Sequence, residues 1–185
     1  MIWPFRRKSK KRMARIVIEE PITSSTRIAT LKALKQVEER EFPALILRID
    51  SPGGTVGDSQ EIFSAINRLK SKGCKVVASF GNISASGGVY IGVAADKIIA
   101  NPGTITGSIG VLGGKLNLRG IYNKVGLTKD IITRGKNADI YSDYSNFSQS
   151  EREKMEKMLH TVYDDFVNKV AEGRKKTYDE IHQIA

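Results

Sequence analysis

Two glycine-rich turns hold the residues of this chain that are best suited to covalent chemistry. They read Asp50-Ser-Pro-Gly-Gly54 and Ser84-Ala-Ser-Gly-Gly88. Each follows a short apolar run that predicts a buried strand, and sites in open α/β sheets form where strands end. Ser86 opens a predicted short helix, where its hydroxyl would be exposed beside the Gly87 N–H. Because glycine pairs let backbone N–H groups face an anion, the turns predict a nucleophilic serine with an oxyanion hole. The plain alternative is a serine that only caps the helix.

A nucleophilic serine needs a base to remove its proton. His160 and His182 both fall in predicted C-terminal helices, where they are poorly placed for this role. A lysine is the usual substitute, and it must be partly buried so that its pKa falls. Cys74 is the single cysteine and lies in a predicted buried strand. We therefore expect no disulfide framework, no metal site and no cofactor.

The elements that must position these turns alternate between strand and helix. Strands are predicted at 15–19, 44–50, 74–80, 97–100 and 128–133, with the 44–50 run buried on both faces. Amphipathic stretches predict helices that start at Ser24 or Ser25 and at Asp58. This order predicts an α/β fold with a mostly parallel sheet and right-handed crossovers.

Two capping boxes mark the last predicted helices. Ser148-x-x-Glu151 opens a long helix with an amphipathic stripe, and Thr177-Tyr-Asp-Glu180 opens a second one. Only five residues remain after the second box, before Ala185. A helix that begins and is then cut off leads us to expect a chain truncated at its C-terminus or an unusually short variant.

Composition places the chain among globular proteins. It has 185 residues, 40% of them hydrophobic, which suits one domain. The net charge is +10, but residues 1–16 hold seven basic side chains and no acid, so the basic character belongs to a tail. We expect a basic tail over residues 1–14 and one domain over residues 15–185.

Three interpretations of the tail compete: contact with anionic lipid, nucleic-acid binding, or a solubilising extension. Trp3 and Phe5 favour peripheral membrane contact through residues 1–12. We expect no nucleic-acid partner, because the mixture of aromatic and basic residues does not recur. No apolar run approaches the ~18–20 residues of a membrane span, and the run after the tail is too short for a signal peptide. The expected location is the cytoplasm or the cytoplasmic face of the membrane.

Four motifs together resemble the signal peptide peptidase (SppA) family. In chain order they are Asp50-Ser-Pro-Gly-Gly54, Ser84-Ala-Ser-Gly-Gly-Val-Tyr90, Ala94-Ala-Asp-Lys-Ile98 and Thr104-Ile-Thr-Gly-Ser-Ile-Gly110. Their order and rough spacing match the family, and the resemblance covers about residues 14 to 185. Members are serine/lysine peptidases, so the resemblance implies the ClpP/crotonase fold of repeated ββα units.

The resemblance also implies a role for each matching residue. Ser86 becomes the nucleophile, while the backbone N–H groups of Gly53 or Gly54, and of Gly87, become the oxyanion hole. Family members cleave peptides left in the membrane after signal sequences are removed, and they assemble into rings or domes. We therefore expect a serine endopeptidase acting on extended apolar peptides, and a homo-oligomer with active sites near subunit interfaces.

The base lysine departs from the family pattern. The family places it in Gly-x-x-Lys, but here Ala138 stands three residues after Gly135, and Lys136 lies two residues earlier. Along an extended segment two residues keep the same side but shift the group by roughly 6–7 Å. We take Lys136 as the base and Lys115 as the weaker candidate.

Two other functions stay open. The missing lysine at position 138 allows a catalytically inactive scaffold or a peptide-binding module of the same fold. Acyl-CoA chemistry of the crotonase kind is less favoured, because the Ser-Gly-Gly motif puts a nucleophile where those enzymes rely on backbone N–H groups and carboxylates. The family's usual membrane anchor is missing from this sequence, which leaves only the basic tail.

Overall fold

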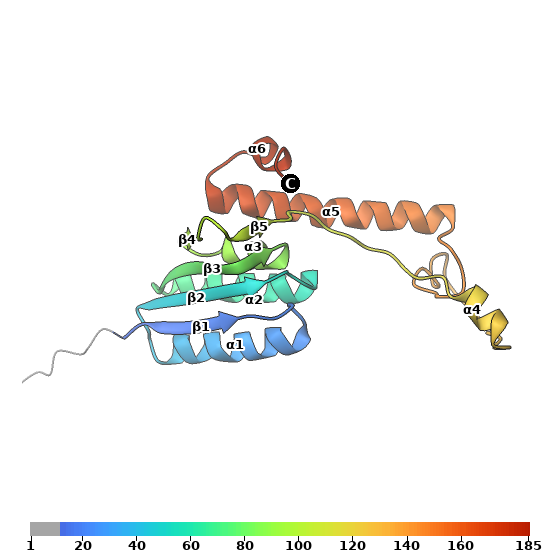
Figure 1. Ribbon diagram of the computed structural model, residues 1–185, viewed down its shortest axis with the longest axis horizontal. Helices are drawn as coiled ribbons and strands as arrows, with labels where there is room; N and C mark the ends of the chain where they lie inside the picture. Colours follow the sequence, from blue (N-terminus) through green and yellow to red (C-terminus); the bar gives the residue numbers. More distant parts are fainter. Residues whose placement is uncertain (1–11) are drawn as a thin grey trace, which may run out of the picture. The chain divides into compact units, whose positions relative to one another are not determined.

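The computed structural model describes residues 12–185 and contains two compact units (Figure 1). The first unit consists of the residues before Gly110 together with Phe166–Ala185, and the second consists of Gly110–Asp165. The expected membrane contact of residues 1–12 falls almost wholly outside the described residues.

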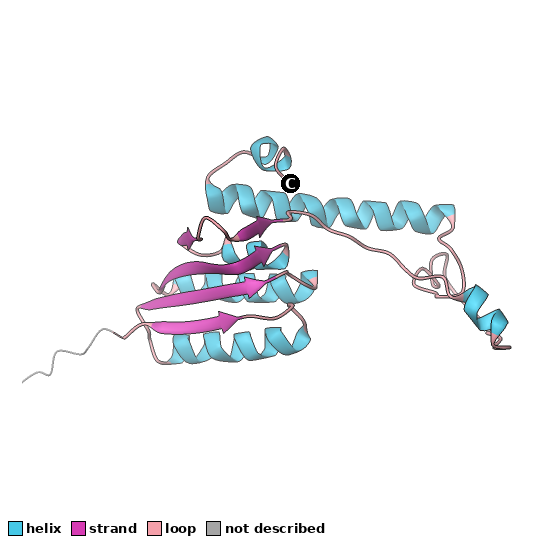
Figure 2. Ribbon diagram, in the orientation of Figure 1, coloured by secondary structure: helices cyan, strands magenta, loops and turns pink. Residues whose placement is uncertain are grey.

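A parallel sheet forms the centre of the first unit, and its strands are drawn in magenta in Figure 2. The strands are β1 (Ala14–Ile18), β2 (Ala44–Ser51), β3 (Lys75–Ala85), β4 (Lys97–Ile99) and β5 (Ile105–Gly107). Their order is β1-β2-β3-β4, and β5 pairs with the end of β3 beyond β4. Every pairing is parallel, so the predicted α/β class with a mostly parallel sheet is confirmed.

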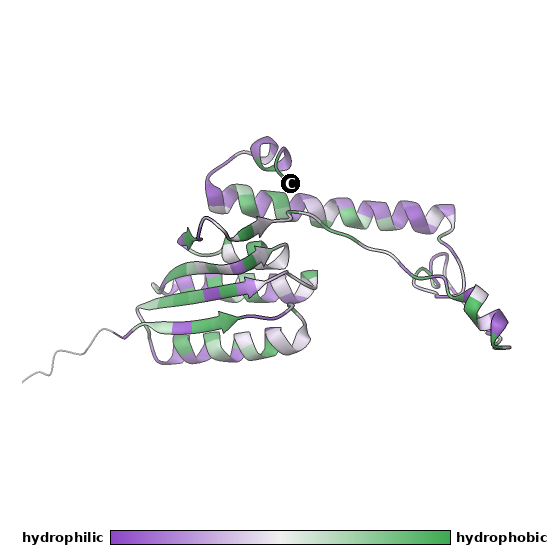
Figure 3. Ribbon diagram, viewed as in Figure 1, coloured by the Kyte–Doolittle hydropathy of each residue, from purple (hydrophilic) through white to green (hydrophobic). Residues whose placement is uncertain are grey.

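Three helices follow the strands of this unit: α1 (Ser24–Glu39), α2 (Val56–Ser71) and α3 (Gly87–Gly92). In Figure 1, α1 and α2 run side by side along the sheet, and the two helices contact each other. Figure 3 shows apolar residues concentrated on β1, β2 and β3 and polar residues spread along the helices. Helix α2 begins at Val56, two residues before its predicted start at Asp58. The Asp58 carboxylate instead accepts a 2.7 Å hydrogen bond from Arg27 Nε.

Strand β2 is buried on only one of its faces. The fully buried face consists of Leu45, Leu47, Ile49 and Ser51. The opposite face is half-buried, which corrects the predicted burial on both faces. Arg48 lies there and donates to Ser79 Oγ and to the Phe80 carbonyl. A guanidinium stays charged, so this face keeps access to water.

Strand β3 continues to Ala85, five residues past its predicted end at Phe80. Two contacts hold this extension. The Asp50 carboxylate accepts a 3.0 Å hydrogen bond from the Ile83 N–H, and β5 pairs with Ile83–Ala85. The residues between the predicted strand end at Phe80 and Ser86 are therefore part of β3, which ends at Ala85, directly before Ser86.

The second unit contains α4 (Arg119–Lys124) and most of α5 (Gln149–Arg174), which ends in the first unit. The strand predicted at 128–133 is wrong: the structure has no strand there. Both predicted capping boxes form. Ser148 and Glu151 bond reciprocally at the start of α5, and Thr177 and Glu180 do so before α6 (Tyr178–His182).

Candidate active site

Ser86 sits at the abrupt change from β3 to α3, in a strained backbone conformation. Its φ is 50° and its ψ is −119°, a combination that glycine tolerates and other residues rarely adopt. Its N–H donates to the Gly107 carbonyl at 2.9 Å, and its carbonyl accepts the Tyr90 N–H at 2.9 Å. A serine on a sharp turn between strand and helix has the geometry of a nucleophile elbow.

The Ser86 side chain does not cap the helix that it opens. Ser86 occupies the N-cap position of α3, but its hydroxyl makes no capping hydrogen bond. The side chain is half-buried. The plain alternative of a capping serine is therefore not what the structure shows, and the hydroxyl remains available for other chemistry.

Gly53 lies in contact with the backbone around Ser86. A Cβ atom on Gly53 would stand 2.7 Å from the Gly87 nitrogen, 2.7 Å from Ser86 Cβ and 2.8 Å from the Ala85 carbonyl oxygen. Its φ of 101° also belongs to glycine. The two glycine-rich turns, at least 30 residues apart in the sequence, are thus brought together, because neighbouring parallel strands end at the same edge of the sheet.

Two backbone N–H groups near Ser86 have no acceptor. Within residues 12–185, neither the Gly54 amide nor the Gly87 amide donates a hydrogen bond to another group. A Cβ atom on Gly87 would lie 3.2 Å from the Gly54 nitrogen, so the two amides are close to each other. Gly54 is exposed, which leaves its amide open to a ligand. Unused amides beside a serine can stabilise an oxyanion.

The direction of the Gly54 N–H follows from its peptide plane. The Gly53 carbonyl accepts a 2.9 Å hydrogen bond from the Ile22 N–H. In a planar trans peptide the carbonyl oxygen and the following amide hydrogen point in opposite directions. The Gly54 N–H therefore points away from the Ile22 amide. The Gly53 amide, in contrast, is already bonded to Ser51 Oγ at 3.2 Å, so of the two glycines only Gly54 has an unbonded amide within the described residues.

Asp50 has a structural role beside this site. Its carboxylate accepts hydrogen bonds from the Ile83 N–H and from Asn82 Nδ2. Hydrogen bonds from the Ile83 and Asn82 backbone hold the pKa of Asp50 below its usual value. An ionised carboxylate occupied in this way fixes the end of β3 and does not exchange protons near neutral pH.

The two candidate lysines both belong to the second unit, whereas Ser86 and the three glycines belong to the first. Lys136 is exposed and follows Gly135, whose φ is 114° in the turn where the Ala138 N–H bonds back to the Gly135 carbonyl. Nothing in the described residues holds the Lys136 amine in place.

Lys115 has the more protected amine. Its Nζ is buried without a hydrogen-bond partner in residues 12–185, and it lies 4.6 Å from the centre of the Phe147 ring. The Glu151 carboxylate belongs to the same unit, and Glu151 is only 3% exposed. The Ser148 N–H is the main cause that lowers the pKa of Glu151, and the Lys115 charge adds to it. Partial burial, the property required of a base lysine, belongs to Lys115 and not to Lys136.

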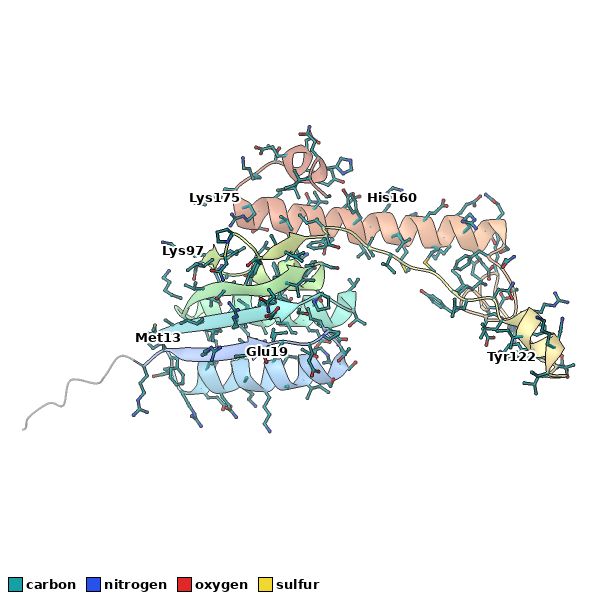
Figure 4. The ribbon with its side chains drawn as sticks, viewed as in Figure 1. Met13, Glu19, Lys97, Tyr122, His160 and Lys175 are labelled. Carbon is teal, nitrogen blue, oxygen red and sulfur yellow. The ribbon has the colours of Figure 1, made fainter. Side chains whose placement is uncertain are left out.

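Other functional groups contribute little to this region. His160, labelled in Figure 4, is exposed on α5, and His182 is exposed on α6. Cys74 is buried, and burial raises the pKa of its thiol. Among residues 12–185 no three His, Cys, Asp or Glu side chains gather into a possible metal site. In the same range, no helix has the length and apolar character needed to cross a bilayer.

The sequence pattern did not single out Ser51, which the structure places beside this site. It lies inside the first glycine-rich turn, and its hydroxyl accepts the Gly53 N–H two residues on. Serine side chains often bond to backbone groups two residues away, so the spacing Ser51-x-Gly53 was a usable indication.

Comparison with solved structures supports the fold. A ClpP1 variant from Listeria monocytogenes superposes with a TM-score of 0.61 at 17% sequence identity, covering 94% of this chain and 78% of that one. ClpP1 from the same organism gives a TM-score of 0.57 at 16% identity, covering 92% and 77%. At these identities the likeness establishes the ClpP/crotonase-like fold alone.

Comparison with sequence families and curated proteins supports a peptidase relationship. Residues 68–185 match the model of peptidase family S49. A Synechocystis sp. protein named as a protease (slr0021) is 48% identical over the whole of this chain and 66% of its own length. The chloroplastic serine protease SPPA of Arabidopsis thaliana is 36% identical over 80% of this chain and 22% of its own. Protease 4 of Salmonella typhi is 34% identical over 77% of this chain and 23% of its own. The chain thus spans between about a fifth and two thirds of these relatives.

Proposed function

The chain belongs to peptidase family S49, and on that premise we propose that it is a serine peptidase in which Ser86 attacks the peptide carbonyl. The observation that carries the proposal is the Ser86 elbow, with φ at 50° and no capping bond. Backbone strain of this kind persists where surrounding contacts enforce it, and it is concentrated at functional sites. The unused Gly54 and Gly87 amides beside it supply the second requirement of acyl transfer.

The proposed reaction has two halves. Ser86 Oγ forms a bond to the substrate carbonyl carbon while its proton passes to a neutral lysine amine. The carbonyl oxygen becomes an oxyanion, which the Gly54 and Gly87 N–H groups stabilise, with Gly53 shaping the turn. The carbon–nitrogen bond then breaks, and the lysine returns the proton to the leaving amine. Water hydrolyses the acyl-serine and restores the Ser86 hydroxyl.

The identity of the lysine is the open part of this proposal. Lys136 is the choice that the SppA resemblance favours, in spite of its displacement from the position of Ala138. Lys115 is supported by geometry: its amine is buried without a hydrogen-bond partner in the described residues, whereas Lys136 is exposed. Single replacements of the two side chains separate the candidates.

Substrate and assembly follow the same family resemblance. We propose extended apolar peptides, such as remnant signal peptides, as substrates, and a homo-oligomer with active sites near subunit interfaces. Large apolar side chains of the second unit support an interface, since Leu112, Leu116 and Ile132 are 94%, 74% and 96% exposed. We also propose that residues 1–12 contact anionic lipid at the cytoplasmic face of the membrane.

Labelling with a fluorophosphonate probe tests the nucleophile. The wild-type protein should be labelled and Ser86→Ala should not, while circular dichroism confirms that both are folded. Absence of labelling in a folded wild-type oligomer would refute the peptidase proposal. It would favour the inactive peptide-binding module, which Ala138 and the exposed Lys136 already allow.

The same assay assigns the base. Lys136→Ala and Lys115→Ala are compared by their labelling rates, with Lys124→Ala, an exposed lysine of α4, as the matched control. Loss of general-base catalysis should slow labelling by about 10²–10⁴-fold. Lys136 is supported if its variant alone shows this loss, and it is excluded if only Lys115→Ala does.

A further inference from the structure

Ser51 ends β2 with a hydroxyl that is completely buried and fully bonded. The residue is 0% exposed. Its Oγ donates to the Glu20 carbonyl at 2.8 Å and accepts the Gly53 N–H at 3.2 Å. Because a hydroxyl has a single proton, donation to Glu20 leaves only lone pairs to face Gly53. One side chain therefore ties the loop after β1 to the glycine turn.

These bonds fix the peptides on both sides of Gly53. Ser51 holds the N–H of the Pro52–Gly53 peptide, and the Ile22 N–H holds the carbonyl of the Gly53–Gly54 peptide, so the two bonds together limit the torsions of Gly53 that orient the Gly54 N–H. Ile22 also accepts the Thr55 N–H at 2.9 Å, so the turn is bonded before and after this peptide. Glycine has no side chain that would restrict its torsions, and without such bonds the turn could adopt other conformations.

We propose that Ser51 is a positioning residue for the oxyanion hole. It fixes the Gly53–Gly54 peptide so that the Gly54 N–H faces the substrate carbonyl bound at Ser86. This inference rests on the proposed peptidase function and goes beyond it by naming what orients the donor. Ser51 does not touch the substrate; it acts through Gly53.

Removal of the hydroxyl should affect the transition state selectively. Deleting an oxyanion donor lowers kcat by about 10²–10³-fold. Ser51→Ala keeps the Gly54 N–H but frees the turn, so we expect kcat to fall by about ten- to hundred-fold with KM nearly unchanged. Ser51→Thr keeps the hydroxyl and should retain most of the activity.

Ser84 provides a matched control on the neighbouring strand. It stands opposite Ser51 in the β2–β3 register and is also 0% exposed. Its Oγ has no hydrogen-bond partner within the described residues. Ser84→Ala therefore removes the same atom from the same layer of the sheet without breaking a hydrogen bond, and we expect activity close to that of the wild type.

The decisive experiment compares a peptide aldehyde with the corresponding peptide alcohol as inhibitors. Only the aldehyde forms a tetrahedral adduct with a serine and places an oxyanion in the hole. Ser51→Ala should weaken aldehyde binding by about ten- to hundred-fold and alcohol binding by less than about threefold. Equal weakening of both inhibitors, or an equal effect of Ser84→Ala, would overturn the positioning role.

The outcomes separate this inference from the proposed function. A wild-type protein that binds aldehyde and alcohol equally refutes the peptidase itself. A wild-type protein that prefers the aldehyde, together with a Ser51→Ala variant that keeps the preference, refutes only the role of Ser51. Amide hydrogen exchange gives a readout without any inhibitor: the Gly53 amide should exchange at least about tenfold faster in Ser51→Ala, and unchanged exchange contradicts the proposed bond.

Discussion

Replacing Ser86 by glycine should leave the protein more stable than replacing it by alanine, although both changes remove the hydroxyl of the proposed nucleophile. The reason is the Ser86 backbone, whose φ of 50° and ψ of −119° match the first central position of a type II′ turn. Glycine is the residue that adopts this conformation without a Cβ clash. Alanine keeps the Cβ atom and therefore keeps the strain.

The expected difference is the balance of two opposing effects. Relief of a rarely populated conformation contributes about 1–3 kcal/mol. The greater freedom of glycine in the unfolded chain opposes it by about 0.5–1 kcal/mol. The Ser86→Gly variant should therefore exceed Ser86→Ala by about 0.5–2 kcal/mol in free energy of unfolding. In a domain of this size that difference raises Tm by about 1–8 °C.

Urea unfolding followed by circular dichroism measures the difference directly. The control is Ala29→Gly at an exposed position inside α1, where the same change should destabilise the protein by about 1 kcal/mol. Opposite signs at positions 86 and 29 would establish that strain is stored in the Ser86 backbone. A Ser86→Gly variant no more stable than Ser86→Ala would refute the reasoning.

Two further changes test the surroundings of the site. Asp50→Asn should destabilise the protein at pH 7, because the pKa of Asp50 is lowered in the folded state. The ionised carboxylate therefore stabilises the fold above its pKa in the unfolded chain, and this stabilisation is lost as the pH falls through its pKa in the folded protein. The difference from wild type in free energy of unfolding, measured with urea, should shrink as the pH falls from about 4. A difference independent of pH would contradict this. Phe166→Ala should lower the free energy of unfolding by about 3–5 kcal/mol, because the residue is 4% exposed and its ring centre lies 5.1 Å from that of Tyr90. A decrease below about 1 kcal/mol in urea unfolding would show that this aromatic contact is dispensable.

Local pattern was enough to predict strands β1 to β4 and helices α1 and α2 of the first unit in outline, but not β5. The apolar runs that became β2 and β3 lie beside glycine turns, and parallel strands bring such turns to one edge of the sheet. The end of β3 was misjudged because its last residues depend on Asp50 and on β5, both distant in the sequence. The strand predicted at 128–133 failed for the converse reason: Ile131 and Ile132 have strand propensity, but propensity without a pairing partner does not make a strand.

Some features of the candidate site could likewise be predicted from the sequence, and others could not. Gly53 and Gly87 could be recognised because glycine is required at both positions: a Cβ atom on Gly53 would collide with backbone atoms of Gly87 and Ala85, and one on Gly87 would stand 2.6 Å from Ser59 Oγ. The strain at Ser86 and the unbonded Gly54 N–H could not be predicted from the sequence, because both depend on backbone torsion angles. The burial of the Lys115 amine depends on Phe147, 32 residues later in the chain.

This division bears on the two parts of the proposed Ser/Lys dyad. Ser86 and the Gly54 and Gly87 amides lie where strands of one sheet end, so their geometry follows from hydrogen bonds within the first unit. Both candidate lysines belong to the second unit, where no strand contains Lys136 and where burial of the amine distinguishes Lys115. A serine with free oxyanion donors still reacts with fluorophosphonates, but more slowly without its base. The rate of labelling therefore reports on the lysine, whereas the site of labelling reports on Ser86, and the two halves of the proposal can fail independently.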